Sequence, residues 1–182
     1  FSETGQKNED LTLRYLVDNG TLKIQFCKSH MTLKSLKDLN KDLTVNVPAK
    51  VFSELNIDSV NANVNINSVE ASKLEIDNVS GTLTVNGAYN TVDIDNVSGN
   101  ATISNSATIG NIDVDTVSGD FTLVMPQNIS GFILDYDCVS GNVGTTGFNA
   151  VNNTKEKTVT YGDESIKIEL DSVSGDLNIT AE

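Results

Sequence analysis

The chain has 182 residues, of which 38% are apolar, and a net charge of −13, so it is long enough for one domain with its own core. Residues 74–154 contain no lysine or arginine, which excludes nucleic-acid binding there, because phosphate contacts require clustered cations. The same acidity argues against adhesion to an anionic membrane, and no apolar run approaches the roughly 18 residues of a membrane span.

The first 50 residues do not share the pattern of the rest. The first ten are polar, and we expect them to form a frayed lead-in. Residues 11–17 and 21–26 alternate between apolar and polar around the turn sequence Asp18-Asn19-Gly20, which predicts a hairpin. Residues 28–41 carry leucines at partly helical spacing without a cap, so we expect a loop with at most one helical turn. Residues 43–47 are a predicted strand that stops at Pro48.

Lysines and the two cysteines receive simple interpretations. Cys27 and Cys138 lie 111 residues apart and are expected to be free thiols, although a disulfide stays open because it depends on the distance between their Cα atoms. The lysines of residues 21–50 are spaced among leucines, which is typical of a solvated face; they are Lys23, Lys28, Lys34, Lys37, Lys41 and Lys50.

One phrase, Val-Ser-Gly, is repeated five times in the remaining chain. It stands in the frame apolar-x-apolar-Asp-polar-Val-Ser-Gly-x-apolar-x-apolar, and a degenerate sixth copy has Asn61-Ala62 in place of Ser-Gly. Counted from Ala62, the copies are 19, 18, 20, 22 and 34 residues apart. A repeat near 20 residues is typical of stacked architectures. The glycines of the five copies are Gly81, Gly99, Gly119, Gly141 and Gly175.

Each repeat reads as two short strands around a bend. Leu74 and Ile76 alternate with polar residues before Gly81, and Leu83 and Val85 do so after it. Glycine suits the bend because it reaches positive φ, and the preceding aspartate can bond a downstream amide as an Asx turn. We therefore predict an all-β fold, a single-stranded β-solenoid of stacked coils of 18–22 residues. The bend aspartates are Asp58, Asp77, Asp95, Asp115, Asp137 and Asp171.

Stacking of the repeats predicts columns of equivalent side chains. The inward columns are Ile57, Ile76, Ile94, Val114 and Leu170 before the bend, and Val64, Leu83, Ala101, Phe121, Val143 and Leu177 after it. Acidic pairs at i and i+2 should form two outward columns: Glu75/Asp77, Asp93/Asp95, Asp113/Asp115, Asp135/Asp137 and Glu169/Asp171. Calcium would require six to eight converging oxygens, and the Gly-Gly-x-Gly-x-Asp repeat is missing, so we expect no metal and no cofactor.

The domain organisation follows from these elements. We expect a single domain over residues 1–182. It consists of a lead-in at 1–20, first strands with a lysine-bearing loop at 21–50, regular repeats at 51–143, and an excursion with the last repeat at 144–182. The excursion is predicted from the long final step and holds two strands, at residues 158–161 and 165–170.

The residues expected of an enzyme are missing from the repeats. His30 is the one histidine and Arg14 the one arginine, and both lie outside the repeats. A catalytic serine in Val-Ser-Gly would have no base, and a uronate lyase would have neither base nor cation. A hydrolase that uses two carboxylates is harder to exclude, but Asp-x-Asp pairs recur in every repeat whereas a site occurs once. We expect no catalytic residue.

Three segments together resemble a known family. Residues 22–24 (Leu-Lys-Ile), residues 43–48 (Leu-Thr-Val-Asn-Val-Pro) and the serial Asp-x-Val-Ser-Gly units are similar to the bacterial family of candidate adhesins, β-strand-repeat domains also called toastrack domains. Residues 121–126 (Phe-Thr-Leu-Val-Met-Pro) match as well, and the resemblance covers residues 20–182. It implies an extracytoplasmic bacterial protein, secreted or anchored at the surface, with some relatives tied to envelope-stress sensing and no catalytic motif.

Three function classes are then open. The first is a non-enzymatic surface module that contacts a protein or glycan of the cell envelope, through the excursion at 142–165 and the lysine-bearing residues 28–41. The second is an envelope-stress sensor that binds a small or lipid-like ligand. The third is a polysaccharide-active enzyme, since β-solenoids often host lyases and hydrolases. We rank them in that order, with no nucleic acid as partner and no direct membrane insertion.

Overall fold

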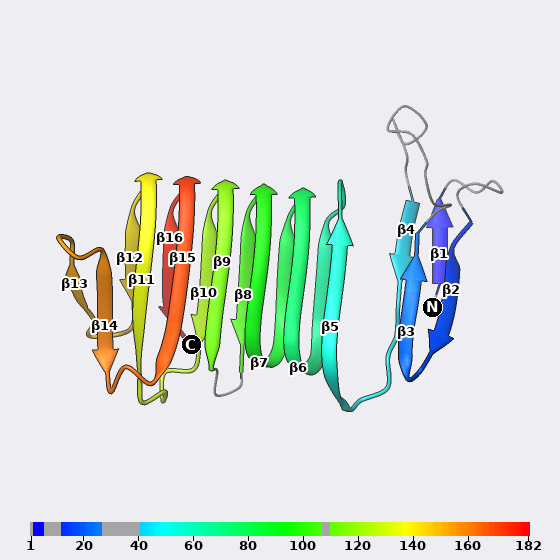
Figure 1. The fold of residues 1–182 in the computed structure, drawn as a ribbon, viewed down its shortest axis with the longest axis horizontal. Coiled ribbons are helices and arrows are strands. Elements are labelled where there is room, and N and C mark those ends of the chain that lie inside the picture. Colours follow the sequence, from blue (N-terminus) through cyan, green and yellow to red (C-terminus); the bar gives the residue numbers. More distant parts are fainter. Residues whose placement is uncertain (1, 6–11, 27–40, 107–109) are drawn as a thin grey trace. The chain divides into compact units, whose positions relative to one another are not determined.

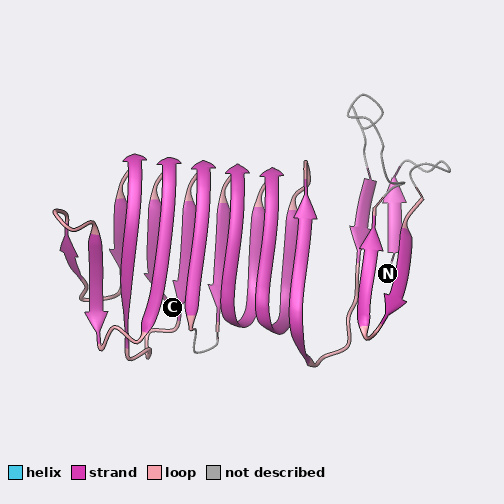
Figure 2. Ribbon diagram, in the orientation of Figure 1, coloured by secondary structure: helices cyan, strands magenta, loops and turns pink. Residues whose placement is uncertain are grey.

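The computed structural model describes residues 2–5, 12–26, 41–106 and 110–182. These residues form strands and turns with no helix among them, so the fold is all-β (Figure 2). Contacts divide the chain into two compact units, Phe1–Pro48 and Ala49–Glu182, where the sequence suggested a single domain. The division falls after Pro48 because the described strands of the first unit pair only with one another.

The first unit holds two small antiparallel sheets. Strands β2 (Arg14–Asp18) and β3 (Thr21–Gln25) form the predicted hairpin, with Asn19 and Gly20 at φ of 48° and 80° in its turn. Strand β1 (Ser2–Gly5) pairs with β4 (Lys41–Thr44). The prediction of a frayed lead-in is therefore wrong for residues 2–5, and the strand predicted at 43–47 begins and ends earlier, matching its four-residue partner. The predicted loop at 28–41 lies outside the described residues except for Lys41.

The second unit is one sheet of 12 strands. The strands are β5 (Val51–Ser59), β6 (Val64–Ser80), β7 (Leu83–Ser98), β8 (Ala101–Asn105), β9 (Asn111–Ser118), β10 (Phe121–Met125), β11 (Gly131–Ser140), β12 (Val143–Thr146), β13 (Val151–Asn153), β14 (Thr158–Gly162), β15 (Ile166–Ser174) and β16 (Leu177–Ala181).

These strands lie in two rows, one behind the other (Figure 1). The first row contains the strands that precede a Val-Ser-Gly bend: β5, the later parts of β6 and β7, then β9, β15 and β11. The second row contains those that follow a bend: the early parts of β6 and β7, then β8, β10, β16 and β12. All these pairings are parallel and join equivalent residues of neighbouring repeats.

The last repeat lies between two earlier ones. Strand β15 pairs with β9 on one side and with β11 on the other, and β16 likewise lies between β10 and β12 (Figure 1). The order of the repeats in the stack therefore departs from their order in the chain at the final two repeats. After β10 the chain passes over one position, and the long final step lets it return and fill that position.

The core lies between the two rows. The predicted inward residues Ile76, Val114, Leu83 and Phe121 are at most 1% exposed, and their equivalents in the inner repeats are at most 2% exposed. At the two ends of the stack Ile57, Val64 and Val143 are only half-buried. The predicted inward columns are confirmed. Because of the order of the strands in the stack, Leu170 and Leu177 lie next to β11 and β12, which are the last strands of the two rows.

The excursion closes the β11 end of the first row. Strand β14 pairs antiparallel with β11, and β13 pairs with β14. Phe148 and Tyr161 pack against Phe132 with ring centroids 5.4 and 5.7 Å from its own. An antiparallel hairpin covers the backbone edge that the last parallel strand would otherwise expose.

Candidate interaction surface

The repeated frame sends alternate side chains to opposite sides of the first row. In β7, Asp95 and Val97 are exposed, whereas Ile94 and Asn96 are 1% and 4% exposed. This follows from the two-residue period of a strand. The aspartate and valine of every repeat therefore share the outer face, and the polar residue between them points inward.

Each Val-Ser-Gly glycine lies where the chain turns from the first row to the second. Their φ angles run from +112° to +143°, a region that residues with a Cβ rarely adopt. A Cβ on Gly99 would overlap the carbonyl oxygen of Gly81 on the neighbouring repeat, and the same overlap recurs along the column. In order of contact, the column contains Gly81, Gly99, Gly119, Gly175 and Gly141.

The bend serines contact backbone of neighbouring repeats. Ser80 Oγ donates to the carbonyl of Val60, and Ser98 Oγ donates to that of Val79, each at 3.2 Å. The described residues include no histidine, and His30 lies outside them. These hydroxyls therefore help to hold the stack together, and no described imidazole can activate them as nucleophiles.

The side chains that cap the bends are not those of the frame aspartates. Asn100 Oδ1 accepts from the amide of Asp120, whose own Oδ1 accepts from the amide of Asp176, both at 3.0 Å. Asp176 Oδ1 accepts in turn from the amide of Asn142 at 2.9 Å. This column stands directly after the glycines, where the sequence holds Thr, Asn or Asp in every repeat. The frame aspartates instead lie within strands: Asp58, Asp77, Asp95, Asp115, Asp137 and Asp171.

A polar column lies inside the bends. Asn78 Nδ2 donates to Asn96 Oδ1, and Asn96 Nδ2 donates to the carbonyl of Gly99, both at 2.8 Å. Cys138 occupies the same position in its repeat as a half-buried free thiol, with Sγ 3.9 Å from the carbonyl oxygen of Gly175. Cys27 lies outside the described residues, so the question of a disulfide is not addressed by them.

The outer face of the first row carries three adjoining columns, which we call the acid–valine face. Nearest the bend are Val60, Val79, Val97, Val117, Val173 and Val139, between 46% and 80% exposed. Next comes an unbroken aspartate column, Asp58, Asp77, Asp95, Asp115, Asp171 and Asp137. Beyond it are Glu75, Asp93, Asp113, Glu169 and Asp135. The two predicted acidic columns are thus confirmed.

Neighbouring carboxylates on this face disfavour one another's charge. The pKa of Asp115 is raised from its ordinary value by desolvation first, and then by the charges of Asp113 and Asp171. The pKa values of Asp77 and Asp113 are also raised, again by desolvation first and then by carboxylates on adjacent strands. Like charges on paired strands repel, so the face does not stabilise the fold.

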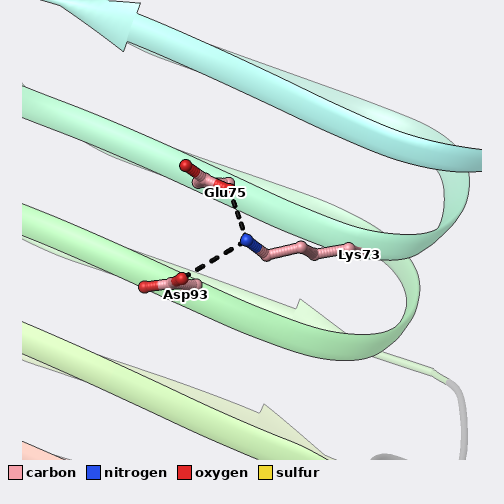
Figure 3. A network of polar contacts seen from close by, with 3 residues as sticks. All are labelled: Lys73, Glu75 and Asp93. Carbon is pink, nitrogen blue, oxygen red and sulfur yellow. Dashed lines mark hydrogen bonds and ion pairs between the residues drawn. The ribbon is translucent and has the colours of Figure 1, made fainter.

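Lysines reach the acid–valine face at its margins. Lys73 forms ion pairs with Glu75 on its own strand and with Asp93 on the next, the latter at 3.5 Å (Figure 3). Lys157, from the turn before β14, pairs with Asp137. In the middle of the face, no described lysine or arginine forms an ion pair with Asp95, Asp113, Asp115 or Asp171.

A shallow open depression of about 480 Å³ follows the boundary between the valine and aspartate columns. It crosses β7, β9, β15 and β11 and is lined by the valines and aspartates of all four strands. Its floor includes the buried residues Asn96, Thr116 and Ser172. A groove of this shape offers apolar contact on one side and negative charge on the other.

The described residues offer little else that suggests chemistry. Within them, no group of three or more histidine, cysteine or acidic residues is placed to hold a metal ion. No helix that could cross a membrane occurs in the described part of the chain. The acid–valine face, with its exposed valines, adjoining carboxylates and groove, is the candidate functional site.

Comparisons with known proteins agree with this architecture. The family model described as Toastrack DUF4097 matches residues 4–180. A crystal structure of a candidate cell adhesion protein from Clostridium sporogenes ATCC 15579 is similar, with a TM-score of 0.53 and 15% sequence identity over 99% of this chain and 81% of that one. At that identity the likeness concerns the fold alone. No curated protein matches the sequence.

Proposed function

Because the chain belongs to the Toastrack DUF4097 family, we propose that it is a non-enzymatic surface module that binds a protein or glycan of the bacterial cell envelope. The observation that carries this proposal is the acid–valine face, which combines an exposed valine in every repeat with carboxylates that, in the middle of the face, pair with no described cation. Polar uncharged residues in these positions would leave the fold at least as stable. Binding is therefore the simplest reason for such a surface.

The sheet of the second unit suits such a role. We interpret it as a single-stranded β-solenoid with one coil for each repeat, and the parallel register between equivalent residues supports this interpretation. Stacked repeats present an extended surface with the same groups at a regular spacing. Multipoint contact is favoured by such a surface.

The setting that we propose is extracytoplasmic, at the surface or secreted. The similar structure from Clostridium sporogenes is named for cell adhesion, and that supports the same class of function here. The resemblance to surface domains of bacteria points the same way.

The contact surface proposed here differs from the two regions that the sequence suggested. Sequence reasoning placed contact at the excursion of residues 142–165, but Phe148 and Tyr161 of that segment pack inward on Phe132. The other region, residues 28–41, lies outside the described residues except for Lys41. The acid–valine face is the broader alternative and spans six strands of the first row.

The competing classes receive less support. A sensor of small or lipid-like ligands would be favoured by an enclosed apolar cavity, and the two best-formed depressions of the described residues are open to solvent. A carboxylate-pair enzyme would be favoured by one pair that differs from the rest. The acids of the face repeat in every strand instead.

The test uses the full chain immobilised on beads and exposed to solubilised envelope of its source bacterium. We expect a specific protein or glycan to be retained, and a panel of polysaccharides and glycosides to show no turnover. Beads carrying a heat-unfolded sample of the chain serve as the control. Turnover that a single Asp→Asn change abolishes would refute the non-enzymatic assignment.

A further inference from the structure

The valine column is not required by the strands that carry it. On the outer face of the second row, the column at the strand centres is polar and contains Asn65, Thr84, Thr102, Thr122 and Asn178. Threonine favours strands as valine does and keeps the surface polar. The exposed valines, at 46% to 80%, are therefore an apolar stripe that the fold itself does not need.

The aspartate column beside this stripe restricts what can cover it. A partner that buried the valines would also remove water from Asp95, Asp115 and Asp171, none of which pairs with a described cation. Burying a carboxylate without a partner charge is strongly unfavourable. The covering molecule must therefore bring apolar groups to one column and cations to the next.

The chain itself shows how an amine fits this face. The Lys73 ammonium lies between the carboxylates of Glu75 and Asp93, which stand on adjacent strands (Figure 3). At the other margin, Lys157 pairs with one carboxylate of the face, that of Asp137. Carboxylates on neighbouring strands are thus close enough for one ammonium to contact two of them.

The depression along the column boundary suggests the form of the ligand. It crosses four strands, which at a strand spacing of about 4.8 Å span about 14 Å. An extended polypeptide advances about 3.3 Å per residue, so about five residues cover this length. Alternate side chains of a segment lying flat along the boundary would point toward the valines and toward the aspartates.

We propose that the acid–valine face binds an extended segment of a partner protein in which basic side chains alternate with apolar ones. The segment lies across the strands of the first row, with its cations on the aspartate column and its apolar side chains on the valine column. This inference rests on the proposed contact function and names the chemistry of the partner. The net charge of −13 favours a basic partner and opposes anionic glycans, anionic membranes and a second acidic copy.

The test is a calorimetric titration at low salt, in which a blocked synthetic peptide of three Lys-Val pairs is added to the full chain. A Lys-Ser peptide of equal charge and a Glu-Val peptide of equal apolarity are the ligand controls. We expect the Lys-Val peptide to bind at least about tenfold more tightly than the Lys-Ser peptide, and the Glu-Val peptide not to bind.

Three variants of the full chain locate the site. The set Asp95→Asn, Asp115→Asn and Asp171→Asn, and separately the set Val97→Thr, Val117→Thr and Val173→Thr, should each weaken peptide binding about tenfold or more. A variant that removes three charges elsewhere should bind as the parent does: Asp18→Asn, Glu164→Gln and Glu182→Gln. Binding that is equal for both lysine peptides, or unchanged in the face variants, would overturn the proposal.

Two further outcomes would also overturn it. Sedimentation showing a dimer of the parent chain that the valine variants dissociate would assign the face to a second copy. Envelope retention that persists unchanged in both face variants would refute this inference and leave the contact function standing. Retention of nothing from the envelope, together with tight peptide binding, would refute the contact function instead.

Discussion

The inward and outward halves of the same five-residue frame differ in what they do for the molecule. Asn96 of β7 points into the bend, where it donates a hydrogen bond to the carbonyl of Gly99. Gly99, directly after β7, packs against the backbone of Gly81 in the neighbouring repeat. Asp95 and Val97, their neighbours in sequence, are exposed and make no ion pair with a described residue. Stacking thus explains why the inward residues of the frame recur in every repeat, but it does not explain the outward ones. For the outward half, we propose that a binding surface is the reason for the repetition.

The largest loss of stability is expected when a glycine of the bends is replaced. Gly99→Ala places a Cβ against the carbonyl oxygen of Gly81 at a φ of +112°, so we expect a loss of about 4 kcal/mol or more in the free energy of unfolding. Gly110→Ala, at which a Cβ would lie 3.3 Å from the carbonyl oxygen of Asn90, is the control. Urea denaturation measures both, and equal losses would contradict the role of the column.

A smaller loss is expected from the inner polar column. Asn96→Ala removes the acceptor of Asn78 Nδ2 and the donor to the Gly99 carbonyl, both buried or half-buried. The expected loss is about 1–3 kcal/mol, because buried polar groups are left without partners. Asn86→Ala, at an exposed position of the same strand, should change stability by less than about 0.5 kcal/mol. The difference in urea midpoint between the two variants is the measurement.

On the acid–valine face, by contrast, a substitution should raise the free energy of unfolding. Asp115→Asn removes a carboxylate whose pKa is raised by desolvation and then by its neighbours, so we expect a gain of about 0.5 kcal/mol after allowance for solvent screening. Asp163→Asn should instead lower the melting temperature, because the pKa of Asp163 is lowered by hydrogen bonds from Ser165. Melting temperatures that fall in both variants would contradict the repulsive character of the face.

The smallest effect should come from the valine column. Val117→Thr exchanges one β-branched residue for another at a 49% exposed position, so stability should stay within about 0.5 kcal/mol of the parent. Val114→Thr, three residues earlier and 1% exposed, buries a hydroxyl and should lose about 1–3 kcal/mol. If both variants lost the same free energy, the valine column would have a structural role.

The bends and columns were predictable because they depend on local rules. Strand alternation places Asp95 and Ile94 on opposite faces, and a glycine at each bend follows from the need for positive φ. The capping role of Asn100 and Asp120 was missed, although a polar residue follows every glycine in the sequence. That regularity was the available signal.

The order of the repeats was not predictable from such rules. Each repeat presents the same inward residues and the same backbone groups, so β9 can pair with β11 or with β15 in the same register. Only the 34-residue final step distinguishes the last repeat, and it indicated an excursion without saying where the chain returns. The two compact units divide after Pro48, a boundary that the alternating strands of the first unit do not signal, and the single domain stays a prediction.

The carboxylates of the acid–valine face should together determine how the free energy of unfolding depends on pH. The pKa values of Asp77, Asp113 and Asp115 are raised in the folded chain, so the folded state binds protons more readily than the unfolded state does. Their ionisation then lowers stability as the pH rises from 3.8 through the folded pKa values. Lowering the pH toward their ordinary value of 3.8 restores it. Asp163, with its lowered pKa, contributes in the opposite direction, and a variant comparison removes that contribution.

The most direct measurement is the free energy of unfolding between pH 7 and about pH 4, close to the ordinary aspartate pKa, in the presence of a chelator. It compares the parent chain with the variant Asp77→Asn, Asp113→Asn and Asp115→Asn. The parent should gain stability relative to this variant as the pH falls, because protonation relieves repulsion on the acid–valine face. A parent that loses stability relative to the variant over the same range would contradict this prediction, since the carboxylates would then be holding the fold together.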